Sequence, residues 1–150
     1  MFKKLSNLFK KEEVKASNEE NLSSINRACS SLLIEVALSD KNFDQEEIKS
    51  MTKALINSYG LSEITILELI DNAQKTVDES TSLYSYTREI NDTFGYEHKL
   101  TLLDNLWDVA IADGNIDKYE EHLIRKISDL LYISHSDFIK VKLNNKDKLS

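Results

Sequence analysis

Residues 34–47 read Ile-Glu-Val-Ala-Leu-Ser-Asp-Lys-Asn-Phe-Asp-Gln-Glu-Glu, and residues 107–120 read Trp-Asp-Val-Ala-Ile-Ala-Asp-Gly-Asn-Ile-Asp-Lys-Tyr-Glu. The two stretches align without a gap at one offset (107 − 34 = 73), and Val, Ala, Asp, Asn, Asp and Glu fall at the same places in both. Glu35 corresponds to Asp108. A match of this kind indicates an internal repeat. We therefore predict two related helix-loop-helix units, each with a small acidic loop.

The composition favours long helices joined by short turns. The 150 residues include no proline and three glycines, whereas the hairpins of a sheet protein usually require more of both. Hydrophobic residues make up 41% of the chain and charged residues 30%, which is the balance of one soluble globular domain. The formal charge of −7 disfavours nucleic acid and anionic ligands, so cations are the more natural ligands.

Apolar residues recur at intervals of three and four along most of the chain, which predicts amphipathic helices. The first helix is expected over 21–39, and the second runs from Asp44 to a stop at Gly60. The third begins at the cap Ser62 and carries a buried stripe of Ile66, Leu67 and Ile70, and the fourth follows a polar break at 78–81. The remaining three are expected over 97–112, from Asp117 and from Ser134. The prediction is an all-α, single-domain bundle of about seven helices with an internal pseudo-twofold repeat. The helical domain is expected over residues 21–143, after a basic amphipathic N-terminal segment and linker at 1–20. A loose end is expected from about Leu143, with residues 144–150 as the C-terminal tail. Cys29 and Trp107 are expected in the core.

Each acidic loop presents the pattern Asp-x-Asn-x-Asp-x-x-Glu between two helices. Carboxylate and amide oxygens are the ligands that Ca²⁺ and Mg²⁺ prefer. The candidate ligands are Asp40, Asn42, Asp44 and Glu47 in the first loop and Asp113, Asn115, Asp117 and Glu120 in the second. The pattern departs from an EF-hand, because its sixth position is Gln45 or Lys118 instead of glycine and its twelfth is Met51 or Ile124 instead of glutamate.

The same residues also match a helix cap without metal. Asp44 with Glu47, and Asp117 with Glu120, follow the capping-box spacing in its acidic form. Such a cap contributes about 1 kcal/mol to stability. It does not account for Asp40 and Asp113, which stand at the negative end of the preceding helix dipole. Metal binding and capping therefore both remain open.

Other chemistry has little support in the sequence. His98, His122 and His135 are scattered and lack zinc-site spacing. No nucleophile and base share a recognisable setting, and no Gly-rich phosphate loop is present, so we expect no catalytic residue and no enzyme activity.

The N-terminal residues 1–13 form a short basic and apolar pattern. Phe2, Leu5, Leu8 and Phe9 have helical spacing, with Lys3, Lys4, Lys10 and Lys11 beside them. A helix of this kind can lie on an anionic membrane surface, or it can pack on the domain or fray. No run approaches the length of a spanning helix.

Residues 32–47 and 106–131 together resemble the TerB-like family of tellurite-resistance proteins. The second stretch contains the sequence Ala-Asp-Gly-Asn-Ile-Asp-Lys-Tyr-Glu. The chain also looks like the TerB-like domain of the membrane-anchored DnaJ-like co-chaperone, and the resemblance covers about residues 22–143. It implies an all-helical domain with a pseudo-twofold repeat, no established catalytic activity, and paired acidic loops proposed to bind a divalent metal. In the first loop, Lys41 replaces the glycine that is usual in the family.

Two functional hypotheses follow. The first is a non-enzymatic, cytoplasmic stress-response domain that binds Ca²⁺ or Mg²⁺ through the acidic loops and presents helical surfaces to protein partners. The alternative is a metal-independent, co-chaperone-like adaptor held near the inner face of the membrane by residues 2–11.

Overall fold

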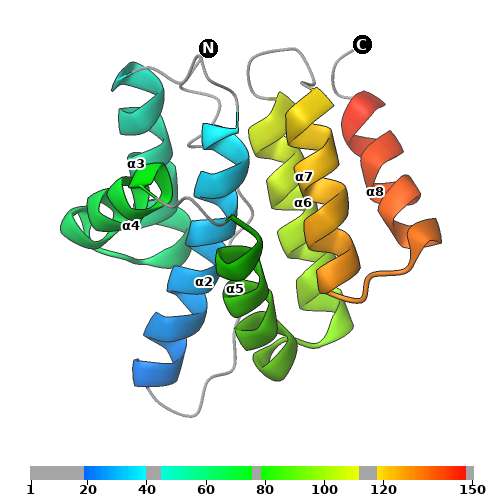
Figure 1. Ribbon diagram of the computed structural model, residues 1–150, viewed down its shortest axis with the longest axis horizontal. Coiled ribbons are helices and arrows are strands. Elements are labelled where there is room, and N and C mark those ends of the chain that lie inside the picture. Colours follow the sequence, from blue (N-terminus) through cyan, green and yellow to red (C-terminus); the bar gives the residue numbers. More distant parts are fainter. Residues whose placement is uncertain (1–18, 40–44, 76–78, 112–117, 148–150) are drawn as a thin grey trace.

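The computed structural model describes residues 19–39, 45–75, 79–111 and 118–147. Within these ranges the backbone forms seven helices and no strand, which confirms the predicted all-α class. The helices are α2 (Glu19–Leu38), α3 (Gln45–Tyr59), α4 (Glu63–Lys75), α5 (Glu79–Thr93), α6 (Tyr96–Ile111), α7 (Lys118–Leu130) and α8 (His135–Lys146) (Figure 1). Most of the predicted N-terminal segment (1–20) lies outside the described residues.

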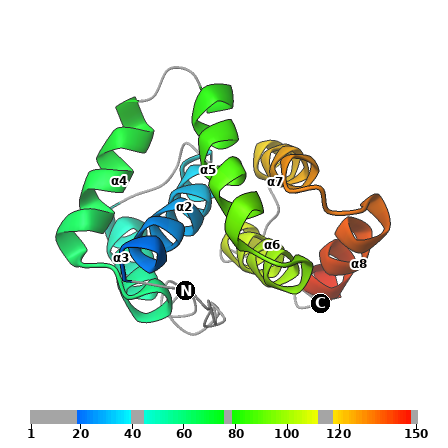
Figure 2. The same cartoon turned by 90° about the horizontal axis from the view of Figure 1, so that it is seen from below.

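Helix α2 is the centre of the bundle. It packs against α4, α5 and α6 and also contacts α3 and α7. Figure 2 shows α2 with α3 and α4 on one side and α6, α7 and α8 on the other. All of residues 28–34 are buried, so nearly two turns of this helix are covered on every face. An uninterrupted run of apolar and small residues produces such a central helix, because no polar face remains for water.

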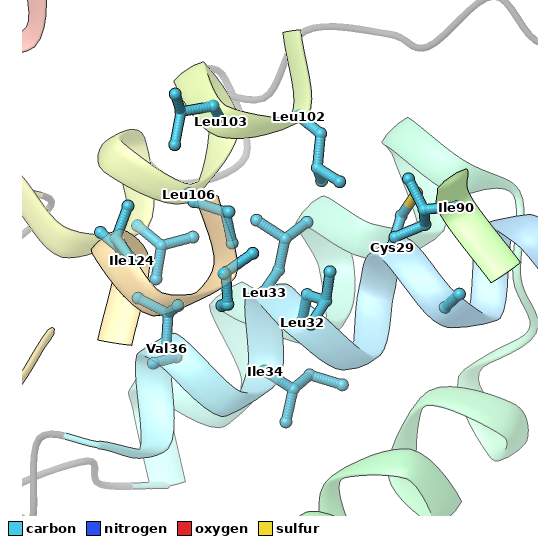
Figure 3. Close-up of a cluster of buried hydrophobic side chains, with 14 of the residues drawn as sticks. Cys29, Leu32, Leu33, Ile34, Val36, Ile90, Leu102, Leu103, Leu106 and Ile124 are labelled. Atoms are coloured by element: carbon cyan, nitrogen blue, oxygen red, sulfur yellow. The ribbon is translucent and has the colours of Figure 1, made fainter. Parts of the chain in front are cut away.

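The core is built around the second half of α2. In Figure 3, Leu32, Leu33 and Val36 of α2 lie in one cluster with side chains from α5, α6 and α7. Leu32 and Leu33 are 0% exposed, and burial of one leucine side chain contributes roughly 1.5–3 kcal/mol. Cys29 belongs to the same cluster and is fully buried, which confirms its predicted place in the core.

Helix α6 joins this core to α7 and α8. Trp107 is 0% exposed, and its ring centroid lies 5.9 Å from that of Phe138 on α8 with the planes tilted by 52°. Tilted pairs at this distance are favourable beyond their buried area. The predicted core position of Trp107 is confirmed, and the ring pair explains how α8 is held at the edge of the bundle (Figure 1).

Three helix ends follow the predicted signals. Gly60 has a left-handed backbone (φ 67°) just after α3, and its N–H donates to Ile56 O at 3.0 Å. The Ser62 hydroxyl accepts from Thr65 N at 3.2 Å before α4. Ser134 is the N-cap of α8 and accepts from Asp137 N at 3.1 Å. These are the Gly stop and Ser caps expected at helix ends.

Two expectations differ from the structure. Leu67 is 44% exposed, although it was expected in the buried stripe of its helix. Helix α4 packs on α2 and α3 through a narrow stripe that contains Ile66 and Ile70, and Leu67 lies about 100° around the helix from Ile66. Helix α8 also runs past Leu143 to Lys146 and buries Asn145, in the part of the chain where a loose end was expected.

The equivalence of the two helix-loop-helix units stays a prediction. No described helix combines the length and apolar character needed to cross a membrane.

Candidate functional site

The two acidic loops connect helix ends that lie at one end of the bundle. The first loop joins the end of α2 at Leu38 to the start of α3 at Gln45, and the second joins Ile111 of α6 to Lys118 of α7. Figure 1 shows these four helix ends together at the top of the view. The helix ends that flank the two loops therefore lie at the same end of the molecule.

Most of the predicted ligands lie outside the described residues. These are Asp40, Asn42, Asp44, Asp113, Asn115 and Asp117, together with the side chain of Glu47. Glu120 is the predicted ligand whose side chain the structure describes. It lies in the first turn of α7 and is 4% exposed. A carboxylate so well buried requires hydrogen bonds or a positive charge nearby. Glu120 therefore belongs to the interior of this helix end and not to its solvated surface.

Both helices that follow the loops begin where the capping pattern predicts. Helix α3 begins at Gln45, directly after Asp44, and α7 begins at Lys118, directly after Asp117. Glu120 and Glu121 then lie in the first turn of α7. Acidic side chains at this position favour the helix because the free backbone N–H groups carry partial positive charge.

A second buried carboxylate lies on the other helix of this hairpin. Asp108 is 0% exposed and stands about one turn before α6 ends at Ile111. The sequence contained a signal for this residue, because an acid between Trp107 and Val109 interrupts an apolar run and corresponds to Glu35 in the repeat. It was not predicted as a site residue. The α6–α7 hairpin thus carries a buried carboxylate on each side of its loop.

Glu121, next to Glu120, is engaged in an ion pair between helices. Its carboxylate pairs with the Lys142 ammonium of α8, and both side chains are largely shielded from solvent. The hydrogen bond from Lys142 holds the pKa of Glu121 below its usual value, and Lys142, Lys146 and Arg125 act in the same direction by charge. Glu121 therefore ties α7 to α8.

No group of three His, Cys, Asp or Glu side chains within the four described ranges is placed to hold a metal ion. His98 lies against Phe94, with ring centroids 5.4 Å apart, and His135 stacks on Phe138 at 6.3 Å. The predicted ligands at 40–44 and 112–117 and the side chain of Glu47 lie outside the described part of the structure, so the absence of such a group does not extend to them.

A family comparison agrees with the fold and with the position of these loops. The model of the family described as "Tellurite resistance protein TerB" matches residues 26–143. This chain belongs to the TerB family. The match includes both acidic loops and every described helix except the beginning of α2 and the end of α8.

The chain is also similar to one curated protein, the "TNF receptor-associated protein 1 homolog, mitochondrial" of Dictyostelium discoideum. The two are 27% identical over 118 residues, which is 77% of this chain and 17% of that protein. The chain thus corresponds to a small part of that relative. No solved structure matches this chain.

Proposed function

We propose that this TerB domain is a non-enzymatic stress-response module that binds a divalent cation through its two acidic loops and responds by changing its stability and its protein contacts. The observation that carries the proposal is the burial of Glu120 beside the second loop, at 4% exposure. A carboxylate buried at the start of α7 suits the inner side of a ligand set whose other proposed members are Asp113, Asn115 and Asp117 of the loop.

The chemistry of the ligand set suits a hard cation. Each loop pattern supplies three carboxylates and one amide, and Ca²⁺ and Mg²⁺ both prefer such oxygen ligands. The charge of −7 adds a long-range attraction for cations. Of the two loops we assign the stronger binding to the second, because Lys41 adds a positive charge to the first where the second has Gly114.

Calorimetric titration of the chelator-stripped protein with Ca²⁺ and then Mg²⁺ tests this function. The wild type is expected to show saturable binding that is lost in an Asp113→Asn, Asp117→Asn double variant. A matched control changes Asp92 and Asp129 to Asn, because both are exposed acids on other parts of the bundle and the charge change is the same. Absence of binding at millimolar concentration, or equal loss in both double variants, would refute the proposal.

The alternative is a metal-independent adaptor that uses its surface for partner proteins. Large exposed side chains favour it, among them Ile64 of α4 at 72%, Tyr119 of α7 at 75% and Tyr132, in the turn after α7, at 78%. Exposed aromatic residues are common at interaction sites. This alternative is preferred if the titration shows no cation binding while the domain remains folded.

A further inference from the structure

The outer face of α4 carries apolar side chains that no described helix covers. Ile64 is 72% exposed and Leu67 is 44% exposed, and their spacing of three places them side by side on the helix. Ile66 and Ile70 of the same helix are buried against the bundle, where α4 packs on α2 and α3. In Figure 2, α4 lies at the outer edge of the molecule.

Acidic side chains flank this apolar pair. Glu63, Glu68 and Asp71 are exposed on the same helix. Asp71 pairs with Lys75 at 2.9 Å, but both side chains are more than half exposed, so the pair leaves the acidic character of the helix largely intact. An apolar pair with acids around it fits a ligand that is apolar along one side and basic beside it.

The chain contains one such segment, at residues 2–11. Phe2, Leu5, Leu8 and Phe9 provide the apolar side, and lysines at 3, 4, 10 and 11 provide the charge. The segment itself lies outside the described residues, and the chain continues into α2 at Glu19. The intervening residues 12–18 span up to about 23 Å when extended. Since α4 packs directly on α2, its outer face is within reach.

We propose that residues 2–11 bind in cis to the outer face of α4, with their apolar side on Ile64 and Leu67 and their lysines beside Glu63 and Glu68. Covalent attachment raises the local concentration of the segment to the millimolar range, so even a small interface is populated. Docking shields Ile64 and Leu67 from water and makes the basic segment unavailable to an anionic membrane. This contact is independent of the cation site proposed above.

A spin label attached through Ser6→Cys in the full-length chain tests the contact. Cys29 is fully buried, so the label reacts at position 6. Paramagnetic broadening of backbone amide signals in ¹⁵N-labelled protein should be strongest at residues 63–71. Raising the salt concentration should reduce it, because exposed ion pairs are screened. Broadening that is absent, or strongest on another helix, overturns the proposal.

Charge reversal adds a second readout. Glu68→Lys is expected to weaken docking by about fivefold, and adding Lys10→Glu to the same chain should restore the broadening. Asp129→Lys is the control, because it makes the same charge reversal at an exposed site on α7, and it should have no effect on the broadening. Ile64→Ser should weaken docking by about tenfold without affecting the fold, because Ile64 is mostly exposed.

A mixed sample separates this contact from its competitors. In this sample, chains that carry ¹⁵N but no spin label are mixed with chains that carry the spin label but no ¹⁵N. If the ¹⁵N signals broaden as strongly as in the doubly labelled chain, the contact is between two copies, which overturns docking in cis. Vesicles containing anionic lipid provide the other comparison. If the segment binds these vesicles, and the α4 signals show no broadening when vesicles are absent, the proposal is overturned and a membrane role is favoured.

Discussion

The buried amide of Asn145 ties the last helix to α6 through Asp104. Its Nδ2 donates to Asp104 Oδ1 at 2.7 Å and to Val141 O at 2.9 Å. Asn145 is 0% exposed although it stands near the end of the described chain. A hydrogen bond to a carboxylate is worth more than one between neutral groups. This contact explains why α8 continues through a Lys- and Asn-rich sequence.

Asn145→Ala should therefore destabilise the domain. The change removes a buried donor to a charged acceptor, and we expect a loss of about 2 kcal/mol in the free energy of unfolding. Asn144→Ala is the matched control, because the neighbouring side chain is exposed, and it should change stability by less than about 0.5 kcal/mol. Urea denaturation followed by circular dichroism measures both. Equal, small effects would show that the end of α8 is held by apolar packing alone.

The Glu121–Lys142 pair predicts a dependence of stability on pH. The pKa of Glu121 is lowered in the folded chain, chiefly by the hydrogen bond from Lys142, so the unfolded state binds more protons on acidification. The stabilising contribution is present above the unfolded pKa and is lost as pH falls through the lower, folded pKa. Glu121→Gln should therefore be less stable than wild type at about pH 6, and the difference should shrink toward about pH 3.

Denaturant titrations of the two proteins across this pH range provide the measurement. Glu97→Gln serves as the control, since Glu97 is an exposed acid near the start of α6. A difference between wild type and Glu121→Gln that stays constant with pH would contradict the assignment of the shift to this ion pair.

Local signals in the sequence predicted the helices well because each helix is specified by its own residues. The three- and four-residue spacing located every described helix, and Gly60 and Ser134 marked ends that the structure confirms. The face that each helix buries was less predictable. Ile66 and Leu67 are equally apolar, and only the packing of α4 on α2 and α3 determines that Leu67 remains exposed.

The candidate site was predictable only as a pattern. The loop residues and Glu120 follow from the repeat, and the structure adds that Glu120 is buried. Asp108 was missed because acids on a helix are normally solvated, and its burial depends on how α6 packs against its neighbours. The bond from Asn145 to Asp104 joins residues 41 positions apart, and no local rule predicts it.

Tyr132 occupies a position that normally favours glycine. Its φ is 58°, and its N–H donates to Asp129 O while Ile133 N donates to Ser128 O, which is the Schellman arrangement after α7. Tyr132→Gly should relieve left-handed strain and stabilise the domain by about 0.5–1 kcal/mol. The Lys99 ammonium lies 5.9 Å from the Tyr132 ring centroid, and the loss of this contact in the variant offsets part of the gain in stability.

Tyr119→Gly is the control, and its effect on stability is expected to have the opposite sign. Tyr119 is similarly exposed, at 75%, but lies inside the first turn of α7. Glycine there should destabilise the helix by about 0.5 kcal/mol. Thermal unfolding of both variants measures the two effects. A loss of stability in Tyr132→Gly would show that contacts of the ring outweigh the backbone strain.

Asp117→Ser separates helix capping from cation binding in the second loop. Helix α7 begins at Lys118, and the capping pattern in the sequence assigns the cap to Asp117; serine caps a helix about as well as aspartate. Serine lacks the carboxylate that a divalent cation requires. In chelator, Asp117→Ser should match wild-type stability within about 0.5 kcal/mol, whereas Asp117→Ala should lose about 1 kcal/mol.

Adding Ca²⁺ or Mg²⁺ then tests the binding role directly. A ligand that binds only the folded state stabilises it in proportion to the logarithm of its concentration. The melting temperature of the wild type should therefore rise with cation concentration, and that of Asp117→Ser should rise much less. If both proteins respond equally, or neither responds, Asp117 acts as a helix cap alone and the proposed cation site in this loop is wrong.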